Sequence, residues 1–223
     1  MIVVVGSRHD PVAMALIAAW PGAALCSAED LVSPGWAWAV GDDEAPTWVV
    51  EGRTVEDSDV TGVFLRRSAV YPDELLGIHP DDRTYMASEA HAFLIFVLAS
   101  TRARVASPVA DGGLGDDALR PEHWMPLAAA AGLPLAPLRL RSSHVKRRAP
   151  DTRIVEVVDG QVIGDMTPRR QARIRRFVAA MRLDWAQLLF DGRQRLVALT
   201  SMHSPTPEAV AALGRMLVAG APS

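Results

Sequence analysis

The order of two hydrophobic patterns along the chain constrains its fold more than any other feature of the sequence. Residues 2–5 and 60–65 are short apolar runs, which are typical of strands buried in a parallel sheet. Helical patterns follow them, over residues 11–19 and 84–100. Beyond residue 151 the pattern changes to two hairpin signatures, each with an Asp-Gly turn. The sequence therefore predicts an α/β fold with parallel strands first and antiparallel strands last.

This change of pattern predicts two domains. Residues 1–141 are expected to form an N-terminal α/β domain around a parallel sheet, and residues 152–223 a smaller α+β C-terminal part. Residues 142–151 between them are polar and basic, which is typical of a linker. Residues 36–48 carry three tryptophans among Gly, Pro and acidic residues. We expect an exposed hairpin there that offers a contact surface.

Composition and charge exclude several classes of function. The net charge of -3 creates no overall field that would attract nucleic acid or an anionic membrane, so neither is an expected partner. Cys26 is the only cysteine, which excludes an internal disulfide and a multi-cysteine metal site, and a small buried side chain is its simplest role. The N-terminus does not read as a signal peptide, and the longest apolar stretch, residues 92–99, is too short to cross a bilayer. We therefore expect a soluble cytoplasmic protein.

Several short motifs resemble those of one enzyme family. They are a strand ending in a double arginine (VFLRR), a helix with a glutamate (MASEAHAFLIFVL), a strand with a proline stop (RVASPV) and a helix before a Gly-Leu-Pro turn (HWMPLAAAAGLPLAP). Together they resemble the N-terminal half of ATP-grasp ligases, above all the graspetide-type ligases that crosslink ribosomal peptides, with RimK-like ligases more distant. The run LDWAQLLFDGRQRLVALTSMH resembles part of the catalytic half. The resemblance implies a Rossmann-like pre-ATP-grasp domain followed by an ATP-grasp remnant.

The resemblance also implies that a nucleotide clamp has been lost. Such ligases carry an ATP-covering subdomain that would fall between Leu140 and Arg153. They hold ATP phosphates with two lysines, whereas Lys146 is the only lysine here, against 22 arginines. Their magnesium-binding Glu-x-Asn motif falls where this chain reads VALTSMHSP, and Asp184 and Asp191 are the carboxylates that remain. We interpret the chain as a truncated, degenerate relative with no catalytic residue, metal or cofactor.

Candidate ligand-binding residues lie at the predicted carboxyl edge of the parallel sheet, where α/β proteins bind ligands. Ser7 and Arg8 follow the first strand, where a helix N-terminus offers backbone amides to an anion, and an ordinary turn is the alternative. Arg66 and Arg67 end a later strand, and alternation directs their side chains to opposite faces. One of them, with Glu89 nearby, is a candidate to bind a carboxylate or phosphate, and the other could pair internally, with Glu89 as a candidate partner. A structural ion pair is the alternative to the binding role, and we favour it.

Three other groups have both a functional and a structural interpretation. The His, Asp and Glu residues within 79–91 suit a metal site, but they also suit helix capping, which we favour. Ser201, His203 and Asp191 are the residue types of a hydrolase triad, but the chain has no G-x-S-x-G motif. The helix predicted over residues 168–181 carries five arginines and suits RNA or an acidic peptide. A solvated face or a contact with a partner is its simpler interpretation.

Three functions remain as hypotheses. The first is a noncatalytic protein that recognises a peptide or a full-length ligase in a biosynthetic pathway. The second is a minimal ATP-dependent carboxylate–amine ligase that uses ATP and magnesium, with Arg66, Arg139 or Arg153 in place of the lysines. A small-molecule sensor is a third. We favour the first because the phosphate-binding lysines and the magnesium-binding acid are missing, and we expect a homodimer because loss of a subdomain exposes apolar surface.

Overall fold

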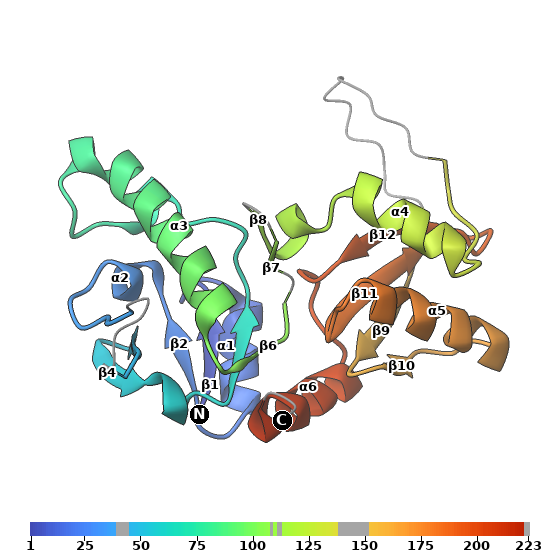
Figure 1. Ribbon diagram of the computed structural model, residues 1–223, viewed down its shortest axis with the longest axis horizontal. Coiled ribbons are helices and arrows are strands. Elements are labelled where there is room, and N and C mark those ends of the chain that lie inside the picture. Colours follow the sequence, from blue (N-terminus) through green and yellow to red (C-terminus); the bar gives the residue numbers. More distant parts are fainter. Residues whose placement is uncertain (39–44, 108, 111–112, 138–151, 221–223) are drawn as a thin grey trace.

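The computed structural model describes residues 1–38, 45–107, 109–110, 113–137 and 152–220. Two four-stranded sheets organise these residues into two lobes, as Figure 1 shows. The first lobe is built on a parallel sheet and the second on an antiparallel sheet. The predicted α/β fold with parallel strands first is therefore confirmed.

The first lobe has the strand order β2–β1–β5–β6. Its strands are β1 (Ile2–Val5), β2 (Ala23–Cys26), β5 (Gly62–Leu65) and β6 (Arg104–Val105). In parallel register, Ile2 of β1 lies opposite Ala23 on one side and Gly62 on the other. Because the chain leaves β1 first towards β2 and later returns to β5, the switch point of the sheet lies between β1 and β5.

Helices cover both faces of the parallel sheet. The covering helices are α1 (Pro11–Ala19) and α6 (Pro207–Ala219) on one face and α2 (Ala28–Leu31) and α3 (Arg83–Ser100) on the other. Asp10 caps the start of α1, since its carboxylate accepts a hydrogen bond from the amide of Val12 at 2.9 Å. Cys26 lies fully buried on the α3 side, and burial raises the pKa of its thiol above the usual range.

A hairpin packs beside this sheet, formed by β3 (Thr47–Val50) and β4 (Arg53–Glu56). The prediction that its tryptophans form an exposed contact surface is wrong. Trp48 is fully buried and its Nε1 donates a hydrogen bond to Asp57 at 2.8 Å. Trp36 and Trp38 pack against Trp48, and Phe93 of α3 packs against Trp36. The tryptophans therefore form part of the core between the hairpin and α3.

The second lobe has the strand order β10–β9–β11–β12. Its strands are β9 (Arg153–Val158), β10 (Gln161–Ile163), β11 (Trp185–Phe190) and β12 (Leu196–Thr200), and the helices that share its core are α4 (Pro121–Ala130) and α5 (Pro168–Ala180). Both hairpins predicted from Asp-Gly turns are confirmed. Asp159 and Gly160 adopt positive φ angles of 49° and 73°, as a two-residue hairpin turn requires.

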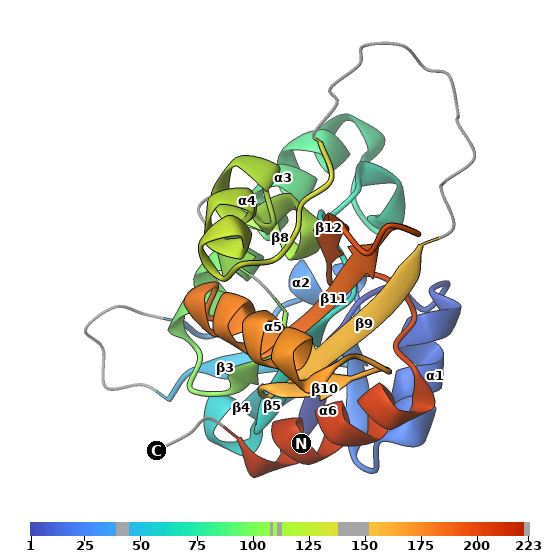
Figure 2. The ribbon, with the colours of Figure 1, turned by 90° about the vertical axis from the view of Figure 1, so that its right-hand side faces the viewer.

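Two helices pack across the boundary that the sequence predicts at residue 141. α4 precedes this boundary but packs on the second sheet, where Trp124 shares a core with Phe177. α6 follows it but contacts β5 of the first sheet as well as β9 of the second (Figures 1 and 2). At that contact a Cβ on Gly62 would lie 2.6 Å from the Cβ of Leu217, so only glycine permits the close approach. The two lobes therefore share buried contacts as well as a connecting segment.

None of the helices in the described part of the chain combines the length and the apolar character that crossing a membrane requires.

Candidate functional site

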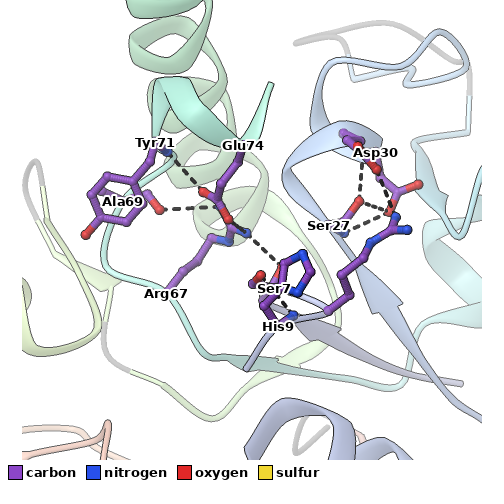
Figure 3. Close-up of polar contacts among 11 residues, drawn as sticks. Ser7, His9, Ser27, Asp30, Arg67, Ala69, Tyr71 and Glu74 are labelled. Atoms are coloured by element: carbon purple, nitrogen blue, oxygen red, sulfur yellow. Dashed lines mark hydrogen bonds and ion pairs between the residues drawn. The ribbon is translucent and has the colours of Figure 1, made fainter. Parts of the chain in front are cut away.

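A crevice lies at the carboxyl edge of the parallel sheet, beside its switch point. Its volume is about 310 Å³, and its lining includes Ser7, Arg8, His9, Ser27, Glu29 and Glu74. These residues come from the segments after β1, β2 and β5, which meet because parallel strands end at the same edge of a sheet. Figure 3 shows Ser7 and His9 between Arg67 and Glu74 on one side and Ser27 and Asp30 on the other. The structure therefore has a crevice at the sheet edge where the candidate ligand-binding residues are expected to lie.

Ser7 and Arg8, two of the candidate ligand-binding residues, both line this crevice. The Oγ of Ser7 accepts a hydrogen bond from the amide of His9 at 3.2 Å, which fixes the turn after β1. Arg8 forms an ion pair with Glu29 at 2.8 Å, and their side chains stay 61% and 50% exposed. An exposed pair of this kind contributes little stability. The ion pair therefore holds Arg8 only weakly at the mouth of a crevice that Asp73 and Glu74 also line.

Arg67 lies behind the crevice with only 5% of its side chain exposed. Its two terminal nitrogens donate to the two carboxylate oxygens of Glu74, each at 3.1 Å, and Nη2 also donates to the carbonyl of Gly6 at 2.7 Å. Planar bidentate pairs of this kind are strong, so Arg67 is paired internally. The prediction that Glu89 is the internal partner is wrong, because Glu89 lies exposed on α3. The partner of Arg67 is instead Glu74, from the short helix η2 (Pro72–Glu74).

Arg66 points to the opposite face of the sheet, as strand alternation predicts. Its Nε donates to the carboxylate of Asp10 at 2.9 Å, and its Nη1 donates to the carbonyl of Met202 at 2.6 Å. Only 8% of its side chain is exposed. Asp10 thus caps α1 and neutralises Arg66 at once. Arg66 joins the edge of the first sheet to the segment after β12, and both arginines are engaged within the protein.

A carboxylate lies at the end of β12, although no acidic residue stands there in the sequence. Asp116, from the short helix η4 (Gly115–Ala118), accepts a hydrogen bond from the amide of Ser201 at 2.6 Å. It also accepts from the hydroxyls of Thr200 and Ser201. Ser201 is fully buried, so this carboxylate closes the end of the strand. The sequence predictions missed Asp116 because it is 85 residues from Ser201.

The two carboxylates that the sequence leaves near the expected magnesium site are each held by arginine. Asp184 accepts from Arg104 Nε at 2.8 Å, and Arg104 reaches Asp159 at 2.6 Å, so β6 is held to the second lobe. The hydrogen bond to Asp184 raises the pKa of Arg104 above its usual range. Asp191 accepts from the amide of Arg195 at 2.8 Å and from its guanidinium at 2.7 Å. These hydrogen bonds, the amide first, hold the pKa of Asp191 below its usual range.

The remaining candidate groups are not assembled into sites. Within the described ranges, no group of three or more His, Cys, Asp and Glu side chains could hold a metal ion. The one ion pair of His79 in this part of the chain is with Asp81, at 3.8 Å, and both side chains are exposed. Ser201 bonds to Asp116, whereas Asp191 fixes its own hairpin turn. The residue types of a hydrolase triad are therefore used separately.

No family model and no curated protein matches the sequence. Solved structures do match. One is the macrocyclase MdnC bound with precursor peptide MdnA from Microcystis aeruginosa, with 12% identity, a TM-score of 0.69 and coverage of 98% of this chain and 99% of that one. Another is a RiPP-associated ATP-grasp ligase from Chryseobacterium gregarium in complex with ADP and a leader and core peptide, with 8% identity, a TM-score of 0.68 and coverage of 97% and 96%.

This chain has the ATP-grasp ligase fold. A third similar structure, the ATP-grasp ligase PsnB complexed with minimal precursor, Mg and ADP, has 15% identity, a TM-score of 0.61 and coverage of 96% of this chain and 98% of that one. The fold part of the predicted resemblance is confirmed, and the likeness extends over both lobes. The predicted gap between Leu140 and Arg153, with Arg139 and Lys146, lies at residues 138–151, outside the described residues.

Proposed function

We propose that this protein is a noncatalytic relative of the peptide-modifying ATP-grasp ligases that binds a peptide or a full-length ligase. The fold supports the family. MdnC, the Chryseobacterium gregarium enzyme and PsnB have each been solved with a precursor peptide or part of one, which supports a peptide-related partner. The protein would thus bind a partner without carrying out ATP-driven chemistry.

The observation that carries the proposal is the mutual neutralisation of charged groups where the lobes meet. Arg66 is held by Asp10, and Arg104 is held by Asp184. A magnesium–triphosphate complex needs cations that can contact phosphate oxygens and oxygen ligands that can contact the metal. The side chains of Arg66 and Arg104 are only 8% and 11% exposed. Because Asp10 and Asp184 are 20% and 36% exposed, breaking either pair costs about 2 kcal/mol, less than for a fully buried pair, and nucleotide binding would have to supply this energy.

The sequence supports the same proposal through its basic residues. A lysine ammonium is a compact cation on a flexible stem, and a guanidinium fork does not replace it where a phosphate oxygen is met end on. Lys146 is the only lysine in the chain, whereas the related ligases are expected to use two. The arginines named as substitutes include Arg66, whose Nε and Nη1 already donate to Asp10 and Met202, and Arg153, which contacts Asp165 at 3.5 Å.

Calorimetric titration of the purified protein with ATP and magnesium tests the proposal. We expect no saturable heat up to millimolar ATP. Saturable binding with a micromolar dissociation constant would contradict it, because a nucleotide site would then exist.

A turnover assay separates the proposal from its alternative, a minimal ATP-dependent carboxylate–amine ligase. The alternative predicts ADP release that depends on an added peptide or amino acid and is lost in Arg66→Ala. Arg53→Ala is the matched control, because Arg53 is exposed on β4, away from the junction of the lobes. We expect background ADP release across a broad panel of substrates. Peptide-dependent release that Arg66→Ala abolishes and Arg53→Ala preserves would establish the ligase instead.

A further inference from the structure

Three large apolar side chains are strongly exposed in a single segment before and within the start of α3. Tyr71, Leu76 and Tyr85 are 55%, 68% and 65% exposed, whereas most large apolar side chains are buried. The segment includes η2 and the short helix η3 (Pro80–Asp82). Arg83 holds these turns to α3, since it donates to the carbonyl of Leu76 at 3.2 Å and to that of Ile78 at 2.9 Å. We call this surface, residues 71–89, the acidic ridge.

Exposed carboxylates accompany these apolar side chains. Asp73, Asp81, Asp82 and Glu89 are all exposed. Among the described residues their ion pairs are limited to a 3.8 Å contact between Asp81 and His79. Exposed tyrosine beside unpaired carboxylates suits a partner rich in arginine, because guanidinium groups bind carboxylates and stack on aromatic faces.

Positive charge is concentrated on α5 of the second lobe. This helix carries five arginines and no carboxylate. Arg169, Arg175 and Arg176 are exposed, and none forms an ion pair with a carboxylate in the part of the chain that the structure describes. Burial, and after it the charge of Arg153, lowers the pKa of Arg170 on the same helix. The outer face of α5 is therefore an uncompensated positive surface.

The whole chain shows the same separation of charge. Residues 1–137 contain 19 acidic and 8 basic residues, whereas residues 138–223 contain 7 acidic and 15 basic residues. Within one molecule α3 and α5 lie in different lobes, on opposite sides of the view in Figure 1. The two complementary surfaces can therefore meet only between molecules, and charge complementarity of this kind both steers association and selects the partner.

We propose that the acidic ridge of one copy binds the arginine face of α5 in a second copy of this chain. The inference rests on the proposed function in one respect, since a noncatalytic protein acts through its surfaces. Arginine would contact the exposed carboxylates and tyrosines of the ridge, and Leu76 would be covered. The arrangement we propose is a twofold dimer, in which this contact forms twice.

Sedimentation of the full chain tests this contact. In 50 mM NaCl we expect a dimer, and in 500 mM NaCl we expect the dissociation constant to rise about tenfold, because salt screens exposed charges. A wild-type chain that stays monomeric up to 100 μM in low salt would overturn the proposal, whatever other partner these surfaces fit. That result would leave the ATP measurement unaffected, so the two proposals fail separately.

Charge reversal locates the contact. The α5 variant reverses three exposed arginines (Arg169→Glu, Arg175→Glu, Arg176→Glu), and the ridge variant reverses three exposed acids (Asp73→Lys, Asp81→Lys, Asp82→Lys). Each variant alone places like charges against each other, so we expect its dissociation constant to rise about tenfold or more. An equimolar mixture restores opposite charges at both contacts of a mixed dimer, and we expect association to return.

A matched control changes the same net charge elsewhere. It reverses three exposed arginines outside α5 (Arg53→Glu, Arg102→Glu, Arg215→Glu). We expect its dissociation constant to stay within about twofold of the wild type, because long-range charge effects are screened. A second α5 variant with Gln at the same three positions should also lose association, and thermal melting confirms that each variant is folded. Equal loss in the control, or no recovery in the mixture of folded variants, would refute the contact.

Discussion

Replacing Gly62 by alanine tests whether α6 holds the first sheet as closely as the structure indicates. A Cβ at this position would lie 2.6 Å from the Cβ of Leu217, 2.7 Å from its carbonyl oxygen and 2.8 Å from its Cα. Carbon atoms pack best at about 3.5–4.0 Å, so α6 has to move away from β5 by about 1 Å. Two of the three atoms belong to the backbone and cannot rotate aside.

The size of the effect follows from this geometry. Overpacking a well-packed core typically costs about 1–3 kcal/mol, and we expect the upper end, about 3 kcal/mol, because a whole helix must shift. For a chain of 223 residues, each kcal/mol lowers the melting temperature by about 2 °C. The Gly62→Ala variant should therefore melt about 6 °C below the wild type in thermal unfolding followed by circular dichroism.

Gly77→Ala is the matched control for this experiment. A Cβ at Gly77 would meet no atom within 4 Å, and its φ is not in the left-handed region. The control should melt within about 1 °C of the wild type, or slightly higher because alanine restricts the unfolded chain. If Gly62→Ala melted at the same temperature as Gly77→Ala, the close contact between α6 and β5 would be refuted.

Three further predictions concern buried and charged groups. Cys26 should react with iodoacetamide far more slowly in the native protein than in urea, because burial keeps its thiol protonated and inaccessible; rapid native labelling would contradict its burial. Arg66→Leu should lower the free energy of unfolding in urea by about 2 kcal/mol, less than for a fully buried pair because the side chain of Asp10 remains 20% exposed; an unchanged midpoint would contradict the ion pair. Asp191→Asn should lower the melting temperature at pH 7, because the lowered pKa of Asp191 beside Arg195 means that the carboxylate stabilises the fold above the unfolded pKa of about 4. That stability is lost as pH falls through the folded pKa, so the difference from the wild type should shrink below pH 4, and a constant difference would contradict the assignment.

Elements set by local sequence are the ones that the sequence predicts. The run over Ile2–Val5 is apolar on both faces, and the structure buries both in a parallel sheet. Asp10 caps α1 through an atom two residues away. Asp159 and Gly160 form the turn that their types favour, and the order of parallel before antiparallel strands follows from such local signals.

Features that depend on distant parts of the chain are the ones that the sequence misses. Trp48 follows a stretch rich in Gly, Pro and acidic residues but is buried, because Trp36 and α3 cover it. Glu89 has the charge to pair with Arg67 but faces solvent, since the face that α3 presents is decided by packing, and Glu74 takes that role. Arg66 and Arg67 were placed correctly on opposite faces of the sheet, yet their partners come from segments that only the folded chain brings near.

The position of α6 also has a consequence for synthesis on the ribosome. Phe64, in the first sheet, packs in the same core as Leu217 of α6, which is translated about 150 residues later. At about 5–20 residues per second, Leu217 is added about 8 to 30 seconds after Phe64. During this interval α1 can cover part of this sheet face, and the apolar side chains that α6 will cover remain exposed. Chaperone capture, or a tendency to aggregate in its absence, is therefore built into the order in which this chain is made.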